Sequence, residues 1–249
     1  MTRSLEYIGL ESLRQLRNGR GFIFTFAIPL VMLLVFGGAY GSGGAVDKTT
    51  GLPWVAVTTI QMAGYGGMMA ALGQAFNIVT ERSLGWNRQL RITPLTGFGY
   101  MVSKVVAALA VSLVSIALLI VISVLTFGST LTFAGWAMAA VGLWIGVIPF
   151  ALIAVLIGQF ARPQSAQPLF MLVFFGMAIV GGLWVPLQIM PDWVSTAAQV
   201  VPSYWLNRLG QMGAALSGDI MTPVLVLVAW SVVLAVFIVW RYRRDAARS

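Results

Sequence analysis

The chain alternates long apolar runs with short polar stretches. No charged residue occurs between Lys104 and Arg162, or within residues 49–80. A helix needs about 20 apolar residues to cross the hydrocarbon core of a bilayer, which is about 30 Å thick. Turn residues near 128–130 divide the longer uncharged run into two. The pattern therefore predicts an all-α polytopic membrane protein with six transmembrane helices, at residues 21–41, 54–78, 99–126, 132–160, 166–188 and 220–240.

Composition agrees with a bilayer as the natural solvent. Hydrophobic residues make up 59% of the chain and charged residues 9%, with a mean hydropathy of +0.91, whereas about a quarter of the residues in a soluble domain are charged. The sequence contains no Cys and no His. Disulfides, thiol chemistry, Ser-His-Asp sites and H-E-x-x-H zinc sites are thereby excluded. We expect no catalytic residue and no metal site on this chain.

The distribution of Lys and Arg predicts the topology. With six spans and both termini cytoplasmic, thirteen of the fifteen basic residues fall on the cytoplasmic side, and Lys48 and Arg208 fall outside. This bias follows the positive-inside rule. The basic residues flank apolar spans, so the net charge of +8 indicates membrane topology and not nucleic-acid binding.

Residues 1–20 carry apolar and charged side chains at helical spacing. Their pattern suits an amphipathic helix in the cytoplasmic membrane interface, with a merely solvated helical extension as the alternative. Glu6 and Glu11 within this leading segment disfavour a cleavable signal peptide. The expected apolar face consists of Leu5, Ile8, Leu13 and Leu16.

The interiors of the spans contain no Asp, Glu, Lys or Arg, which argues against a proton- or sodium-coupled carrier. Polar residues do occur there, and they either form hydrogen bonds between helices or contact a substrate. The small residues of 63–73 permit close helix packing, either within one subunit or at a dimer seam. No Gly-Lys dipeptide occurs, so a P-loop is absent and any energy source lies on another chain. The polar residues are Thr58, Thr59, Gln61, Gln74, Asn77 and Gln159.

One polar stretch, "VTERSLGWNRQLRITPL" at 79–95, separates two uncharged regions. Thr80 is a candidate N-cap for a short helix beginning at Glu81, whose carboxylate suits a helix N-terminus. Pro94 ends the stretch before the third span. A partly apolar cytoplasmic helix over 80–95 is suited to docking with a partner, and an ordinary charged loop is the alternative.

The longer stretch "TERSLGWNRQLRITPLTGFGYMVSKVV" resembles the cytoplasmic loop of type-2 ATP-binding-cassette (ABC) export permeases. Ser83 and Trp86 depart from the family pattern. The resemblance implies that 80–95 is the coupling helix for a partner ATPase, carried by Glu81, Arg82, Gly85, Leu90, Arg91 and Pro94. The positions that match the family motif are Glu81, Arg82, Gly85, Leu90, Thr93, Pro94 and Lys104.

A second stretch, "GGLWVPLQIMPDWVSTAAQVVPSYWLNRL", resembles the segment between spans five and six of the same family. It implies a re-entrant extracytoplasmic hairpin at 189–210, and an aromatic belt beside a surface loop is the alternative. The hairpin or gate residues are Trp184, Pro186, Pro191, Trp193 and Pro202.

Together these resemblances imply a single permease domain over 1–249, located in the plasma (inner) membrane of a prokaryote. The implied partners are a cytoplasmic ABC ATPase subunit, which binds ATP and Mg, a second permease subunit and membrane lipids. The implied function is export of a hydrophobic or amphipathic substrate, such as a drug, a lipid or a glycan precursor, without a cofactor on this chain. The alternative is a non-transporting membrane scaffold or assembly factor that docks a cytoplasmic partner.

Overall fold

The computed structural model describes residues 9–15, 19–41, 45–85, 97–128, 130–184, 187 and 190–246. Throughout these residues the chain is helix or loop, apart from one isolated β-bridge between Val46 and Pro53. A short N-terminal helix covers residues 9–15. The further helices are α2 (Gly19–Gly41), α3 (Trp54–Leu72), α4 (Gln74–Ser83), α6 (Gly97–Phe127), α7 (Phe133–Gly146), α8 (Ile148–Phe160), α9 (Pro163–Val180), α10 (Asp192–Ala198), α11 (Pro202–Ala215) and α12 (Met221–Ala246).

The prediction of an all-helical membrane protein is confirmed. In the described part of the chain, five helical segments are long and apolar enough to cross a membrane. The predicted first span, 21–41, coincides with α2, whose apolar helical stretch is shorter, at Thr25–Ala39. The five longer segments are Trp54–Ser83, Gly97–Phe127, Phe133–Phe160, Pro163–Val180 and Met221–Arg241.

Two of these segments are each built from two helices. Helices α3 and α4 meet at Gly73, where the mainly apolar sequence of α3 gives way to the more polar sequence of α4. Helices α7 and α8 meet at Val147, two residues before Pro149. A proline lacks the N–H that would continue the hydrogen-bond ladder, and its ring clashes with the carbonyl four residues earlier. Helix α7 therefore ends just before this position.

Helix α3 forms the centre of the bundle, and nearly all of its residues are buried. Its glycines let neighbouring helices approach closely. A Cβ added to Gly66 would lie 2.8 Å from Ser115 Oγ, and one added to Gly67 would lie 3.0 Å from Ile116 Cδ1, both on α6. A Cβ at Gly64 would meet a leucine of α7 at 3.3 Å. These glycines thus support packing within one subunit, one of the two alternatives that the sequence left open.

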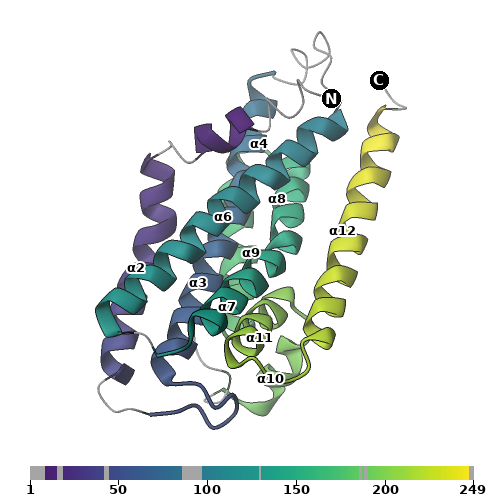
Figure 1. Ribbon diagram of the computed structural model, residues 1–249. Helices are drawn as coiled ribbons and strands as arrows, with labels where there is room; N and C mark the ends of the chain where they lie inside the picture. Colours follow the sequence, from purple (N-terminus) through teal and green to yellow (C-terminus); the bar gives the residue numbers. More distant parts are fainter. Residues whose placement is uncertain are drawn as a thin grey trace.

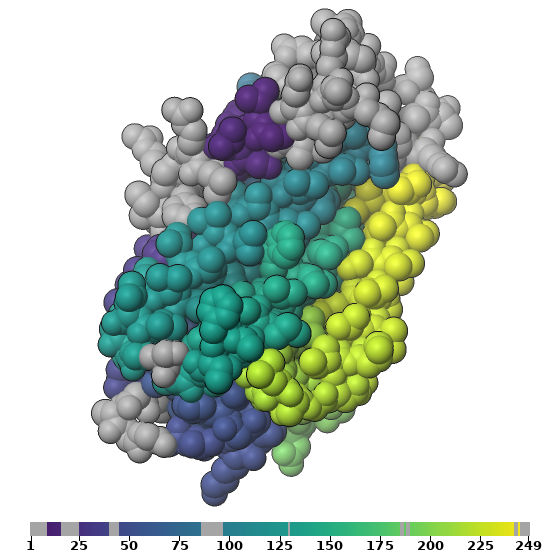
Figure 2. Space-filling view, viewed as in Figure 1, coloured from purple at the N-terminus to yellow at the C-terminus, as the bar shows by residue number. Residues whose placement is uncertain are grey.

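Different helices meet at the two ends of the bundle (Figure 1). The N-terminal helix, the end of α4, the start of α6 and the end of α12 lie at one end, and α10 and α11 lie at the other. Figure 2 shows residues 9–15 in purple against the upper part of α6, with α12 in yellow along one edge.

Apolar side chains cover the outer face of α12, as expected for a helix that faces lipid. They include Leu225, Val228, Val232, Val233, Val236 and Phe237.

Candidate functional site

A buried lysine lies at the end of the bundle where α4 ends and α6 begins. Lys104 follows the first turns of α6, and only 1% of it is exposed. Its Nζ donates to Glu11 Oε1 at 2.6 Å and to Glu81 Oε1 at 2.7 Å. A charge removed from water is tolerated when it is paired and hydrogen-bonded. Lys104 therefore fastens the N-terminal helix and the end of α4 to α6.

Tyr100 completes this cluster from one turn earlier on α6. Its hydroxyl donates to Glu81 Oε2 at 2.6 Å, so both carboxylate oxygens of Glu81 have partners. The Lys104 ammonium lies 5.2 Å from the Tyr100 ring centroid, within cation–π range. Arg14 is 70% exposed and approaches Glu81 only to 3.8 Å, so this ion pair contributes little. We call Glu11, Glu81, Tyr100 and Lys104 the charged cluster.

The N-terminal helix packs with its polar side toward the bundle. Glu11 is 4% exposed, whereas Leu10 and Leu13 are 67% and 58% exposed. Gln15 Nε2 donates to Glu11 Oε1 at 3.1 Å, and Asn77 Nδ2 of α4 donates to Gln15 Oε1 at 3.1 Å. The apolar side is left facing outward, which agrees with an amphipathic helix at a membrane interface.

The environment of Glu11 stabilises its carboxylate form. Burial alone would raise the pKa of Glu11, but the hydrogen bond and positive charge of Lys104, with smaller contributions from Gln15 and Arg14, lower it below its ordinary value of 4.5. Glu11 therefore carries a full negative charge at neutral pH, which the pairing with Lys104 requires.

Arg82 makes a second connection from the end of α4. Its Nη1 donates to the carbonyl of Gln159, and its Nη2 donates to the carbonyl of Ala161. These carbonyls lie at the C-terminal end of α8, where the last turn of a helix leaves acceptors without intrahelical partners. The planar guanidinium presents several donors at once and so satisfies both carbonyls. Arg82 therefore fixes α4 to α8.

The predicted N-cap at Thr80 is wrong. Thr80 and Glu81 lie inside α4, which runs from Gln74 to Ser83 as a continuation of the second apolar segment. No new helix begins at Thr80, because α4 continues through it to Ser83.

Of the six residues predicted for partner coupling, the structure places three together. Glu81 and Arg82 end α4, and Gly85 follows with φ of +76°. Among the described residues a Cβ at Gly85 would have no neighbour within 4 Å, so the positive φ accounts for the glycine. The other predicted residues, Leu90, Arg91 and Pro94, lie outside the described residues.

The described residues that were predicted for the extracytoplasmic hairpin or gate lie between the end of α9 and the start of α11. Trp184 is partly buried beside Phe175, with ring centroids 5.3 Å apart, whereas Trp193 on α10 is 73% exposed. Pro191 immediately precedes α10, and Pro202 is the first residue of α11, positions where a proline fits a helix start. Pro186 lies outside the described residues.

Sequence reasoning missed the partners in the charged cluster. Lys104 was matched to a family motif, but Glu11 lies 93 residues earlier and Tyr100 belonged to no recognised pattern. A usable signal was present, because charged residues are rare in this sequence. Lys104 is one of only two lysines in the sequence and lies near the start of an apolar helix, where a buried charge requires an acidic partner.

Comparison with known proteins identifies the family. The family profile described as ABC-2 type transporter matches residues 8–213, which include the whole charged cluster. The chain belongs to the ABC-2 type transporter family. It is 26% identical over 199 residues to the "Putative transport permease YvfS" of Bacillus subtilis (strain 168), and the alignment covers 78% of each chain. No solved structure matches it.

The family assignment fixes the general role of the chain. An ABC-2 permease is a multi-pass transmembrane subunit of a transport system. Permeases of this family pair with an ABC ATPase subunit. The charged cluster and the Arg82 contacts therefore belong to an ABC-2 permease. They lie where α4 ends, at the end of the helical bundle where residues 80–95 begin.

Proposed function

We propose that this ABC-2 permease is the membrane subunit of an ATP-driven exporter and that residues 80–95 couple it to a cytoplasmic ABC ATPase. The observation that carries the proposal is the attachment of Glu81 and Arg82. Glu81 is bound by Lys104 and Tyr100 of α6, and Arg82 is bound to the last turn of α8. The first residues of the loop are thus joined to the helices that would have to move.

This attachment supports a mechanical role. A loop passes a displacement to a bundle only if its ends are held firmly by the helices. Charge-assisted hydrogen bonds are shorter and stronger than neutral ones, and the bonds at Glu81 are 2.6 and 2.7 Å long. A movement of residues 86–96 would therefore reach α4, α6, α8 and the N-terminal helix together.

The same contacts suggest different roles for the residues of the loop. The polar atoms of Glu81 and Arg82 are engaged within this chain, so these two residues hold the loop in place. Direct contact with the ATPase then falls to residues farther along, including Leu90, Arg91 and Pro94. ATP and Mg would bind to the partner ATPase.

The remaining parts of the proposal follow from the family. A second permease subunit, identical or related, would complete the translocation path in the prokaryotic inner membrane, with both termini cytoplasmic. The segment 189–210 would close the path on the outer side as a gate. The cargo would be a hydrophobic or amphipathic molecule, such as a drug, a lipid or a glycan precursor.

A pull-down in mild detergent tests the proposal. The tagged chain is purified from its own cells, and ATP hydrolysis is assayed in the eluate. We expect an ATPase to co-elute with the natural chain and to be lost from a Leu90→Ser, Arg91→Ala, Pro94→Ser variant. Lys48→Gln, at the opposite end of the bundle, serves as the control and retains the ATPase.

Two results would contradict this proposal. One is a folded chain without an ATPase, and the other is an ATPase that is retained by the triple variant. Co-purification without ATP-dependent transport by the reconstituted pair would instead indicate a scaffold.

A further inference from the structure

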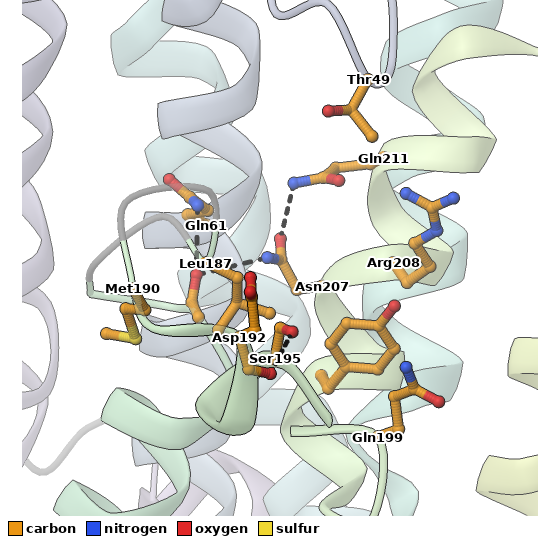
Figure 3. Close-up of a pocket in the computed structure, with 12 residues that line it drawn as sticks. Thr49, Gln61, Leu187, Met190, Asp192, Ser195, Gln199, Asn207, Arg208 and Gln211 are labelled. Carbon is orange, nitrogen blue, oxygen red and sulfur yellow. Dashed lines mark hydrogen bonds between the residues drawn. The ribbon is translucent and has the colours of Figure 1, made fainter. Parts of the chain in front are cut away.

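A polar cavity of about 320 Å³ lies at the end of the bundle opposite the charged cluster (Figure 3). Its volume is at the lower end of the range for small-molecule sites, about 300–1,000 Å³. Most of its walls come from α10, α11 and the segment between α9 and α10. The lining residues are Thr49, Gln61, Gly182, Leu187, Met190, Asp192, Ser195, Gln199, Tyr204, Asn207, Arg208 and Gln211.

Three buried amides form a fixed polar wall of this cavity. The carbonyl of Gly182 accepts from Gln61 Nε2 at 3.1 Å and from Asn207 Nδ2 at 3.3 Å. Gln211 Nε2 in turn donates to Asn207 Oδ1 at 3.2 Å. The three side chains are only 5–8% exposed, so their positions are set by packing. Figure 3 shows this chain of hydrogen bonds from Gln61 to Gln211.

The wall leaves hydrogen-bond acceptors available. The amide oxygens of Gln61 and Gln211 accept no hydrogen bond from the residues that the structure describes. An amide oxygen accepts hydrogen bonds, so a ligand in the cavity that carries N–H or O–H donors would bond to these two oxygens.

Two opposite charges face the cavity from different helices. Asp192 lies in the first turn of α10, and Arg208 lies on α11. Figure 3 shows Asp192 beside Ser195 on one side, with Arg208 across from them. Within the described part of the chain, no ion pair joins Asp192 to Arg208. A ligand with a single charge would be attracted by one of them and repelled by the other, whereas a zwitterion can pair with both.

The surroundings of the cavity suit a membrane surface. Trp193 on α10 and Val200 just after it are 73% and 69% exposed. Tryptophan is enriched at the level of lipid head groups. The loop that carries Thr49 is ordered by Asp47, whose Oδ2 accepts from Thr50 N at 3.0 Å. The cavity thus lies beside apolar side chains that fit the outer boundary of a bilayer.

We propose that this cavity binds a small zwitterionic group, with its ammonium toward Asp192 and its phosphate or carboxylate toward Arg208. The ammonium N–H groups would also reach the amide oxygens of Gln61 and Gln211. The group could belong to a phospholipid head group or to a free zwitterion, since the two share this chemistry. The proposal does not depend on the coupling role of 80–95.

Calorimetric titration of the purified chain in a nonionic detergent tests this site. The probes are sn-glycero-3-phosphoethanolamine, its anionic part glycerol 3-phosphate and its cationic part ethanolamine. We expect the zwitterion to bind at least tenfold more tightly than either part. Asp192→Asn and Arg208→Gln should each lower the affinity for the zwitterion about tenfold. Arg244→Gln, an exposed arginine at the other end of the bundle, should leave its affinity unchanged.

A fourth probe, dihexanoylphosphatidylethanolamine, identifies the source. If this lipid binds more tightly than sn-glycero-3-phosphoethanolamine, the result supports a lipid head group. If the two bind equally, the result supports a free zwitterion. The proposal is overturned if no probe binds, if sorbitol binds as tightly as the zwitterion, or if the folded Asp192 and Arg208 variants bind unchanged. Should a variant misfold, the selectivity of the natural chain among the probes decides.

Discussion

Lys104 Nζ lies 2.6 Å from Glu11 Oε1, although the two residues are separated by 93 positions in the sequence. A second carboxylate, that of Glu81, lies 2.7 Å from the same nitrogen. The ammonium is fully buried, so the N-terminal helix, α4 and α6 meet at a single charge. Removal of this charge would leave two largely buried carboxylates without their cation.

Lys104→Met should therefore destabilise the chain strongly. Breaking a buried ion pair from one side costs about 3–5 kcal/mol, because it leaves an uncompensated charge. We expect a large fall in the melting temperature in detergent, together with poor expression. Lys48→Met removes an exposed lysine and should change little. A melting temperature of Lys104→Met equal to that of Lys48→Met would show that the cluster does not hold these helices.

Docking of the N-terminal helix should depend on acid pH. The pKa of Glu11 is lowered in the folded chain, so its contribution is complete above its ordinary value of 4.5 and is lost as pH falls through the lower folded value. Since the sequence has no Cys, a spin label at Leu13→Cys reports this helix alone. Its mobility should stay constant from pH 8 to 5 and rise below that range.

Glu11→Gln provides the control for this titration. The label should be more mobile at neutral pH in this variant, because the charge is absent. A mobility rise in acid that is the same with and without Glu11 would assign the titration to another group.

Arg82→Ala should loosen the contact between α4 and α8. It leaves the carbonyls of Gln159 and Ala161 without their donor, at a cost of about 1–3 kcal/mol. Hydrogen exchange should speed up in the last turn of α8 and in residues 80–83. Arg82→Lys keeps the charge but lacks the planar guanidinium with its several donors. We therefore expect hydrogen exchange in this variant to be intermediate between that of the natural chain and that of Arg82→Ala. Unchanged exchange in the alanine variant would contradict this role.

Gly158 permits the close approach of α8 to α4. A Cβ at this position would lie 2.5 Å from Ile78 Cγ2 and 2.6 Å from Ile78 Cβ. Gly158→Ala should cost about 1–3 kcal/mol, and Ile78→Ala in the same chain should restore part of the loss. A Cβ added at Gly176 would meet no described atom within 4 Å. Gly176→Ala should therefore be neutral or stabilise α9 by up to about 1 kcal/mol. Equal thermal stability of the two alanine variants would contradict the packing.

The sequence predicted the helical spans well because a bilayer imposes their length and apolar character. Five of the expected segments reappear as membrane-length helices. The helix start at Thr80 and Glu81 was predicted wrongly, because both residues lie inside α4. Hydropathy does not register that the more polar residues 74–83 continue the helical segment that begins at Trp54.

The long-range contacts could not be predicted from local pattern. The pairing of Glu11 with Lys104 and the bonds of Arg82 to α8 join distant parts of the chain. The cavity at Gly182 likewise unites Gln61 of α3 with Asn207 of α11. Such sites depend on which helices become neighbours, and a single sequence does not specify that arrangement.

The most direct test of the account is a distance measurement in the permease–ATPase complex. Spin labels are placed at Leu84→Cys, where α4 ends, and at Val236→Cys on the exposed face of α12. Pulsed electron paramagnetic resonance then records their separation with and without Mg-ATP. We predict that ATP shifts the distance in the natural background and that Glu81→Gln with Arg82→Gln abolishes the shift while the partner still hydrolyses ATP. An undiminished shift in the doubly substituted chain would contradict coupling through these two residues.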